Sequence, residues 1–196
     1  MNECISAAGP RPWSLARRWL QNPKGVATVA PSGPALADRM ASLVPPGPGA
    51  VVEIGPGTGA ITGGLVRAGL GPQVWALEMD PVLARLFRHA HPEIPLIEGD
   101  ATRLTTLLAQ DGIHSVKAIV SSLGLLSMPS PVVSAIADAF AAALPPDAPW
   151  IQYSYGRKSP VPPEILARHG WKATPHGTVL ANLPPARVWT FMRSGA

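Results

Sequence analysis

The sequence has little of the cysteine that cross-links small secreted proteins, and it lacks long apolar segments of the kind that span membranes. Among its 196 residues is one cysteine, Cys4, which excludes an intramolecular disulfide and favours a reducing compartment. No stretch approaches the roughly 18–20 uninterrupted apolar residues of a transmembrane helix. Residues 1–10 lack the basic and then apolar pattern of a secretory signal. With 46% hydrophobic residues to form a core, we expect one soluble, cytoplasmic domain over residues 1–196.

Charged and metal-binding residues are also scarce. The five histidines are scattered without the spacing of metal ligands, so we expect no metal site. Charged residues make up 14% of the chain and are unevenly distributed, with net +3 over residues 1–30, −4 over 31–150 and +5 over 151–196. Two basic ends suggest an anionic partner. Nucleic acid, an anionic membrane surface and ordinary solvated charge all remain open at this point.

From residue 50 onward, short apolar segments alternate with helical patterns. We expect strands at 50–54, 73–78, 95–97, 116–121 and 150–155, and helices at about 58–68, from Pro81 and over 131–144. Such alternation predicts right-handed βαβ units and a parallel sheet covered by helices on both faces. Two further strand-like segments, 170–180 and 186–192, flank a proline-rich turn and predict an antiparallel hairpin. The expected fold is therefore α/β, with a Rossmann-like, seven-stranded, mostly parallel sheet whose core spans residues 50–196.

Residues 1–45 predict helices that precede the sheet. From about residue 11 to 22, apolar and polar positions segregate onto opposite faces at 100° per residue. The apolar face includes Trp13, Leu15, Trp19 and Leu20, and the opposite face carries Arg11, Arg17 and Arg18. Such a helix either lies in a membrane interface or packs on the domain as a lid. A second helix is expected from about Ser32 to Leu43, with Ser32 as its N-cap.

The clearest motif is Glu53-Ile54-Gly55-Pro56-Gly57-Thr58-Gly59, which follows one predicted strand and opens a helix. Glycines let the backbone turn tightly and approach a ligand, and the helix N-terminus offers unpaired N–H groups. Gly55, Gly57 and Ala60 also fit a G-x-G-x-x-A dinucleotide pattern. The glycines alone therefore do not choose between nucleotide cofactors.

Two acids at the ends of the next strands narrow the choice. Glu78 ends the second strand, 23 residues after Gly55, where a carboxylate accepts hydrogen bonds from ribose hydroxyls. Asp100 and Ala101 follow the third strand, where a carboxylate can accept from an adenine amino group. Met79 and Ser121, at the ends of the second and fourth strands, complete the expected cofactor set.

These three motifs together resemble the class I S-adenosylmethionine-dependent methyltransferases. That family has an acid two residues before the first glycine, as Glu53 is here. It binds the ribose through an acid at the position of Glu78. It binds adenine through an acid and the next backbone N–H, as at Asp100 and Ala101. The resemblance implies S-adenosylmethionine as cofactor and S-adenosylhomocysteine as product, and it disfavours NAD.

The fourth strand runs into Ser121-Ser122-Leu123-Gly124-Leu125-Leu126, without the Asn and aromatic residue that hold a flipped base. The chain instead resembles the soluble bacterial phospholipid N-methyltransferases, in the segments 19–23, 29–32, 121–126, 153–156 and 182–187. Gly124 departs from that family, which usually has proline there. The resemblance implies methylation of phosphatidylethanolamine, and of its mono- and dimethyl derivatives, towards phosphatidylcholine at the inner face of the cell membrane.

The same resemblance suggests where substrate and membrane bind. Tyr153 and Tyr155 lie two residues apart, so on a strand both side chains point to one face. There they would line the amine pocket as catalytic residues, and the alternative is that one of them is a core tyrosine. Arg187 would bind a lipid phosphate or cap the hairpin, and the helix at 11–22 would contact anionic phospholipid. No residue stands out as the general base. Two alternatives remain open: a ribosomal-RNA adenine N-methyltransferase, and a membrane-associated cofactor-binding protein without catalysis.

Overall fold

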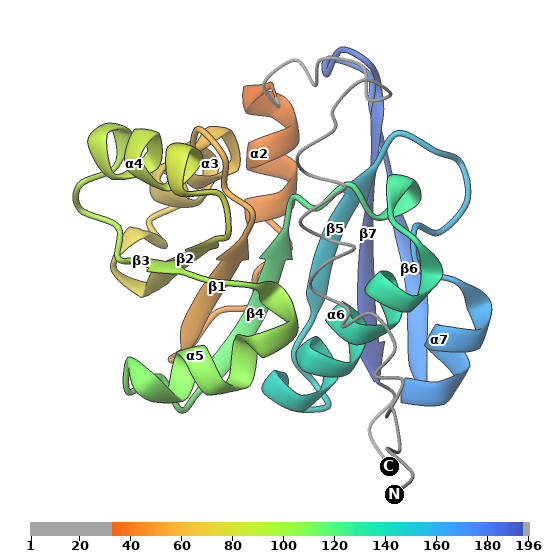
Figure 1. Cartoon of the computed structure of the whole chain (residues 1–196). Helices are drawn as coiled ribbons and strands as arrows, with labels where there is room; N and C mark the ends of the chain where they lie inside the picture. The colour runs from red at the N-terminus through yellow and green to blue at the C-terminus, as the bar shows by residue number, and fades with distance from the viewer. Residues whose placement is uncertain (1–32, 194–196) are drawn as a thin grey trace, which may run out of the picture.

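The sheet has seven strands in the order β3-β2-β1-β4-β5-β7-β6 (Figure 1). This computed structural model describes residues 33–193. The strands are β1 (Ala50–Ile54), β2 (Val74–Glu78), β3 (Leu96–Glu98), β4 (Val116–Ser121), β5 (Trp150–Ser154), β6 (Trp171–Val179) and β7 (Ala186–Arg193). Pairings from β3 through β5 are parallel, whereas β7 is antiparallel to both β5 and β6. The seven-stranded, mostly parallel sheet and its C-terminal hairpin are confirmed.

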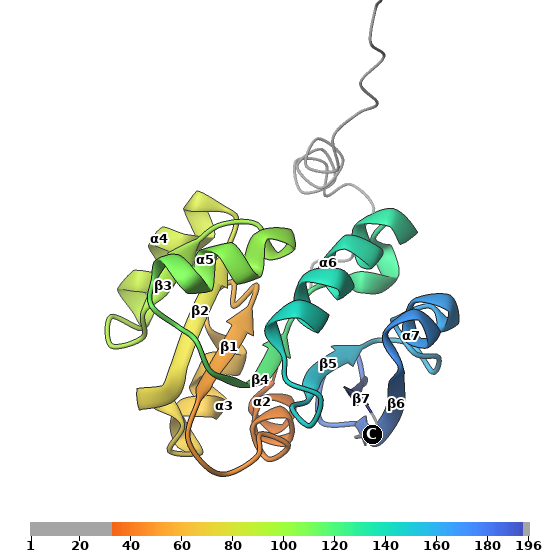
Figure 2. The same cartoon turned by 90° about the horizontal axis from the view of Figure 1, so that it is seen from below.

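Helices cover both faces of this sheet, as the alternating pattern predicts. They are α2 (Pro34–Ala41), α3 (Ala60–Arg67), α4 (Pro81–Ala90), α5 (Leu104–Gln110), α6 (Ser130–Ala143) and α7 (Pro163–His169). Apolar residues of α2, α3 and α4 share one buried cluster, and those of α5, α6 and α7 share the other. Figure 2 shows α5 and α6 on one side of the sheet and α2 and α3 on the other.

Burial on both faces explains why the central strands are mostly apolar. Every residue of β4 and β5 is buried, including the polar Ser121 and Gln152 and the charged Lys117, whose Nζ donates to the carbonyl oxygen of Gly47. Side chains alternate between the two clusters along a strand, as Val51 and Val52 do in β1. On the α6 side, Trp150 packs edge-on against Phe140 with ring centroids 4.9 Å apart.

Helix α2 packs very closely on α3, and this contact depends on one glycine. A Cβ atom at Gly64 would lie 2.6 Å from both the carbonyl carbon and the Cβ of Ala37. No side chain fits at that distance, so Gly64 allows the two helices to touch. This contact places α2 beside the glycine-rich loop that precedes α3.

The structure corrects several predicted boundaries. The prediction of Ser32 as N-cap was wrong, because α2 begins at Pro34 and its N-cap is Gly33. Helix α3 begins at Ala60 and not near Thr58, since the preceding glycines keep the chain in a loop. Helices α5 and α7 were not predicted, because each has seven residues and too little of a periodic pattern. The predicted helix at 11–22 lies outside the described residues.

Two kinds of feature are absent from the described part of the chain. Within residues 33–193, no helix has the length and apolar character needed to cross a bilayer. The same residues contain no cluster of three or more His, Cys, Asp or Glu side chains placed to bind a metal ion.

Candidate cofactor and substrate site

A cavity of about 690 Å³ opens at the carboxyl ends of the parallel strands. It lies where β1 is flanked by β2 on one side and β4 on the other, the point at which the strand order reverses. Open α/β sheets bind ligands at such switch points. Its walls come from the β1–α3 loop, the ends of β2 and β5, the loops after β3 and β4, and Pro184 before β7.

Gly57 and Gly59, in the loop after β1, serve different structural purposes. Gly55 and Gly57 line the cavity, and a Cβ atom at Gly57 would meet nothing within 4 Å although φ there is +57°. At Gly59, which does not line the cavity, a Cβ would lie 2.2 Å from Nε2 of His91. Gly57 therefore leaves open space on the cavity side, whereas Gly59 lets the residue after α4 pack against the loop.

Glu78 ends β2 and holds the loops of the cavity together. Its Oε1 accepts hydrogen bonds from the backbone N–H groups of Met79 at 2.9 Å and Asp80 at 3.0 Å, and its Oε2 accepts one from Gly57 at 3.2 Å. Burial raises the pKa of this carboxyl group, and the three hydrogen bonds oppose that rise. Glu78 and Met79, two of the predicted cofactor-binding residues, both line the cavity.

Glu53 is completely buried beneath the glycine-rich loop and does not line the cavity. Its Oε2 accepts a hydrogen bond from the Thr62 hydroxyl at 2.7 Å, but Oε1 has no hydrogen-bond partner among residues 33–193. Burial raises the pKa of Glu53 to about 7, against the lowering effect of the Thr62 hydrogen bonds. Glu53 therefore supports the loop from below and can change its charge near neutral pH.

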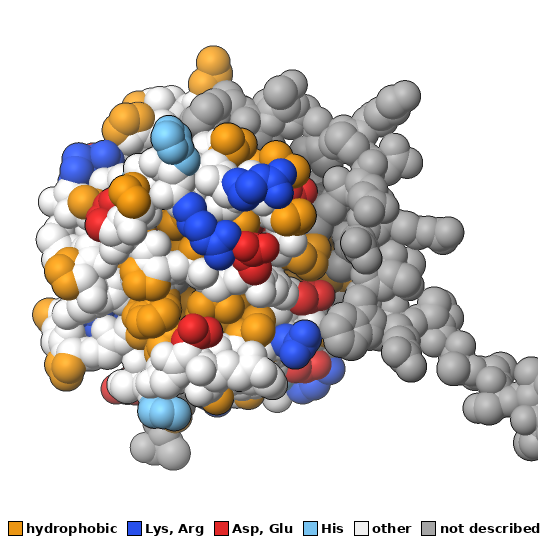
Figure 3. Space-filling model, turned by 60° about the vertical axis from the view of Figure 1, so that its left-hand side comes forward, with side chains coloured by type: hydrophobic (Ala, Val, Ile, Leu, Met, Phe, Trp, Pro, Cys, Tyr) orange, Lys and Arg blue, Asp and Glu red, His pale blue; other side chains and the backbone are white. Residues whose placement is uncertain are grey.

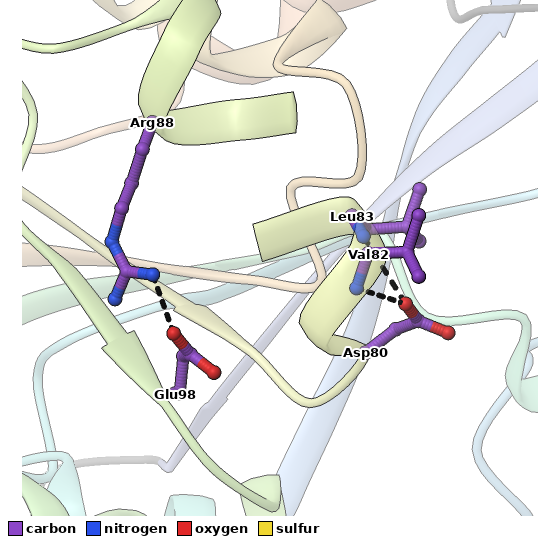
Figure 4. A network of polar contacts seen from close by, with 5 residues as sticks. All are labelled: Asp80, Val82, Leu83, Arg88 and Glu98. Atoms are coloured by element: carbon purple, nitrogen blue, oxygen red, sulfur yellow. Dashed lines mark hydrogen bonds and ion pairs between the residues drawn. The ribbon is translucent and has the colours of Figure 1, made fainter. Parts of the chain in front are cut away.

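The chain after Glu78 is fixed by a helix cap. Asp80 is the N-cap of α4, and its Oδ1 accepts from the N–H groups of Val82 at 2.7 Å and Leu83 at 3.1 Å (Figure 4). Farther along the helix, Arg88 pairs with Glu98 at the end of β3. These contacts fix the segment that joins β2 to β3 beside the cavity.

Asp100 and Ala101 lie in the loop after β3, where both line the cavity. One oxygen of Asp100, Oδ1, accepts hydrogen bonds from the backbone N–H and the hydroxyl of Thr102, each at 2.9 Å. The short 3₁₀ helix that follows, Ala101–Arg103, begins at this cap. The structure thus brings the acid of the second motif and the acid of the third motif to the same cavity.

The loop after β4 forms the far wall, but Ser121 is not part of it. Ser121 is completely buried, whereas Ser122 through Pro129 line the cavity. The hydroxyl of Ser122 is buried without a partner among the described residues. Gln152 of β5 donates from Nε2 to the carbonyl oxygen of Leu123 at 2.9 Å and so holds this loop. Sequence reasoning missed Gln152, although a polar residue within the buried segment Trp150–Ser154 is a visible sign of such a role.

Tyr153 and Tyr155 lie side by side in the cavity wall, as their spacing predicts. Their rings meet edge to face with centroids 5.6 Å apart. Tyr153 is 9% exposed, and Tyr155, one residue past β5, is 39% exposed. Burial, followed by the neighbouring Tyr153, raises the pKa of Tyr155 to about 12. The phenol of Tyr155 is therefore protonated at neutral pH.

The remaining predicted residues lie elsewhere. Arg187 does not line the cavity; its guanidinium donates to the carbonyl oxygen of Arg157 at 3.2 Å and lies 5.8 Å from the ring centroid of Trp189. The predicted membrane-contacting residues lie outside the described part of the chain: Arg11, Trp13, Arg17, Arg18 and Trp19.

Solved structures with the same arrangement include methyltransferases. The glycopeptide N-methyltransferase MtfA, solved with S-adenosylhomocysteine, is similar over 89% of this chain and 96% of its own, with a TM-score of 0.66 and 14% identity. The chain has the class I methyltransferase fold. TrmN from Thermus thermophilus shares it over 82% of this chain and 49% of its own, with a TM-score of 0.60 and 21% identity.

Sequence comparison finds relatives of two kinds, and no protein-family model matches. An ornithine lipid N-methyltransferase of Singulisphaera acidiphila is 34% identical over 117 residues, which are 57% of this chain and 61% of that protein. A ribosomal RNA small subunit methyltransferase A of Chlorobaculum parvum is 52% identical over 50 residues, 26% of this chain and 18% of that enzyme. Each match thus covers less than two thirds of the relative's own length.

Proposed function

We propose that this chain transfers methyl groups from S-adenosylmethionine to the amine of a phospholipid headgroup, phosphatidylethanolamine and its mono- and dimethyl derivatives. The observation that carries the proposal is one continuous cavity. Glu78 and Asp100 line one half, the cofactor half, and Tyr153 and Tyr155 line the other, the aromatic half. The similar ornithine lipid enzyme also acts, by its name, on nitrogen in a lipid. A volume of about 690 Å³ is within the range of small-molecule sites, ~300–1,000 Å³.

The cofactor half of the cavity fits S-adenosylmethionine. We assign Glu78 to the ribose hydroxyls and Asp100, with the N–H of Ala101, to the adenine, because both acids line the cavity at strand ends. The open space beside Gly57 accommodates the part of the cofactor that crosses the glycine-rich loop. The buried, unpartnered Ser122 hydroxyl adds a hydrogen-bonding group on the opposite wall. When bound, S-adenosylmethionine supplies an electrophilic methyl group.

The aromatic half positions and desolvates the amine. A primary alkylamine resembles lysine, with a pKa of ~10.4, so it must lose a proton before its lone pair can attack. Apolar walls favour the neutral amine, because desolvation penalises the charged form. Tyr155 remains a phenol at neutral pH and so contributes its ring and a hydrogen-bonding hydroxyl, not a phenolate base. Aromatic faces also attract methylated ammonium groups, which suits successive methylation.

The proposal places the chain at an anionic membrane surface on the cytoplasmic side. The helix predicted over residues 11–22 supplies an apolar face with Trp13 and Trp19 and a basic face with Arg17 and Arg18. Such helices bind reversibly, with a contribution of roughly 1 kcal/mol from each basic residue near an anionic leaflet. Deletion of residues 1–22 is expected to reduce sedimentation with phosphatidylglycerol vesicles, and full retention would exclude this helix as the membrane element.

A labelling experiment tests the substrate. The purified chain is incubated with methyl-labelled S-adenosylmethionine and, separately, with vesicles of phosphatidylethanolamine, vesicles containing ornithine lipid, and unmethylated small-subunit ribosomal RNA. Label in phosphatidylethanolamine is the expected result. Label in ornithine lipid alone would redirect the headgroup assignment, and label in RNA alone would replace the proposal with the adenine N-methyltransferase that the shorter matches favour.

The role of Tyr155 is tested with a pair of variants. Tyr155→Ala removes the ring from the cavity wall and is expected to abolish methyl transfer while leaving affinity for S-adenosylhomocysteine within about twofold, because the cofactor residues lie in the other half. Tyr155→Phe keeps the ring and is expected to retain most of the transfer. Normal turnover in Tyr155→Ala would show that the amine binds elsewhere.

A further inference from the structure

The turn between β6 and β7, residues 180–185, lies at the rim of the cavity. Strand β7 is antiparallel to both β5 and β6, so β6 runs parallel to β5 and the turn lies at the same edge of the sheet as the carboxyl ends of the parallel strands. Pro184 of this turn lines the cavity, as do Tyr155 and the half-exposed Leu126. Anything that binds the turn therefore contacts the mouth of the site.

Two leucines project from this turn into solvent. Leu180 is 78% exposed and Leu183 is 80% exposed, more than any other large hydrophobic residue described between 33 and 193. Between them, Asn182 is 1% exposed. Its Oδ1 accepts a hydrogen bond from the N–H of Gly33 at 2.7 Å, and its Nδ2 donates to the carbonyl oxygen of Pro184 at 2.7 Å. The turn is thus anchored to the start of α2 by a buried amide while its leucines face outward.

The surroundings of the turn are basic. Residues 165–193 contain no Asp or Glu, and Arg187 follows the turn with its guanidinium on the carbonyl oxygen of Arg157. Arg39 of α2 donates to the carbonyl oxygen of His176 in β6 at 3.0 Å. Within the described chain, none of these arginines forms an ion pair with an acid. An apolar tip flanked by cations has the chemistry that an anionic lipid surface attracts.

The face that carries α4 is different. Figure 3 shows basic and acidic side chains interspersed on that face, with hydrophobic side chains between them. Arg88 pairs there with Glu98, and on the neighbouring helices Arg67 pairs with Asp38 at 2.6 Å. Two arginines on this part of the surface, Arg67 and Arg88, are therefore paired with acids, in contrast to Arg157 and Arg187 beside the turn.

We propose that the β6–β7 turn is a membrane-contacting element, which inserts Leu180 and Leu183 at the boundary of headgroups and acyl chains while Arg157 and Arg187 lie near lipid phosphates. This inference rests on the proposed lipid substrate, and it turns the cavity mouth towards the bilayer. Two leucines on a projecting turn suit a fluid lipid surface better than a second protein, since stable protein interfaces bury ~1,200–2,000 Å² in all. A headgroup can then reach Tyr155 without its lipid leaving the membrane.

Vesicle binding of the full chain tests the inference. The double variant Leu180→Ser/Leu183→Ser is compared with Val82→Ser/Leu86→Ser, which removes two apolar side chains of α4 that are 53% and 51% exposed. Sedimentation uses vesicles of phosphatidylglycerol and phosphatidylethanolamine. We expect the turn variant to need at least tenfold more lipid for half-maximal binding and the α4 variant to match the wild type. Binding of the turn variant within twofold of the wild type would overturn the inference.

A second arm separates this inference from the proposed function. Turnover is measured on phosphatidylethanolamine vesicles and on a short-chain phosphatidylethanolamine dissolved as monomers. The turn variant is expected to lose activity on vesicles and to keep it on monomers, because the leucines do not line the cavity. Equal loss on both substrates would overturn the membrane role. Absence of transfer by the wild type to either substrate would refute the proposed function, while the sedimentation result would still decide the role of the turn.

A fluorescent label gives an independent readout. Leu183→Cys in a Cys4→Ser background carries an environment-sensitive fluorophore at the turn, and Leu86→Cys carries it on α4. We expect a blue shift on addition of anionic vesicles at position 183 and none at position 86. If light scattering shows self-association that is lost in the turn variant, and neither label responds to vesicles, the turn is an interface between copies of the chain and the membrane role is excluded.

Discussion

The stability of this protein is expected to fall as the pH rises from about 4.5 to about 7 because of Glu53. The side chain is completely buried, and its pKa is raised from 4.5 to about 7. Between these two pH values the unfolded chain has lost the Glu53 proton while the folded chain keeps it. The folded state then binds more protons, so raising the pH favours unfolding. The loss begins near pH 4.5 and is complete just above pH 7.

The size of this effect follows from the shift. Each unit of pKa difference corresponds to about 1.36 kcal/mol, so a rise from 4.5 to about 7 destabilises the folded state at pH 8 by about 3 kcal/mol relative to pH 4.5. Glu53→Gln keeps the shape of the side chain and the hydrogen bond from the Thr62 hydroxyl but cannot ionise. The variant is therefore expected to lack this part of the pH dependence.

Urea unfolding of the wild type and Glu53→Gln at half-unit steps from pH 5 to 8 measures the difference. Other titrating groups, including Glu78, are present in both proteins, so their contributions largely cancel. We expect the free energy of unfolding of the variant, relative to the wild type, to increase by about 2.5 kcal/mol across this range, because part of the change lies below pH 5. A difference that stays constant within about 0.5 kcal/mol would show that burial does not keep this carboxyl protonated, and would refute the reasoning.

Three further changes test the site and its supports. Gly57→Ala and Gly112→Ala both place a Cβ atom at positive φ with no other atom within 4 Å. Calorimetry with S-adenosylhomocysteine should show at least tenfold weaker binding for Gly57→Ala and unchanged binding for Gly112→Ala. Equal affinities of the two variants would exclude close approach of the cofactor to Gly57. Gly64→Ala should lower the free energy of unfolding by about 1–3 kcal/mol through overpacking, whereas Gly63→Ala should stabilise α3 slightly. An unchanged free energy of unfolding in Gly64→Ala would contradict the close helix contact. Asn182→Ala leaves the Gly33 N–H without its acceptor and should cost about 1–3 kcal/mol by urea unfolding, and no loss would mean that the turn is anchored otherwise.

Much of the sheet was predictable because buried parallel strands have a strong sequence signature. A mostly apolar segment such as Val116–Ser121 is typical of a central strand, and that strand was predicted with its observed bounds. The end of β2 at Glu78 followed from the same reasoning. Short surface helices were harder, because a seven-residue helix such as Leu104–Gln110 shows less than two turns of periodicity.

The candidate site was predictable where motifs name backbone positions, and less so where long-range contacts decide. Gly57 and Asp100 line the cavity as the motifs imply, since strand ends converge at one edge of the sheet. The packing role of Gly59 against His91 depends on where α4 ends, which no local pattern encodes. The contact of Asn182 with Gly33 joins residues 149 positions apart, and it follows from the path of the hairpin.

The position of Glu78 has a consequence for how substrate and product would compete. Its carboxyl lines the cavity; burial raises its pKa, and three backbone N–H groups favour its anion. The ribose hydroxyls of the proposed cofactor would donate to the same carboxylate and favour the anion further. S-adenosylmethionine and S-adenosylhomocysteine share this ribose, so the contact would stabilise both complexes alike. Glu78 would therefore contribute to product inhibition as much as to cofactor affinity.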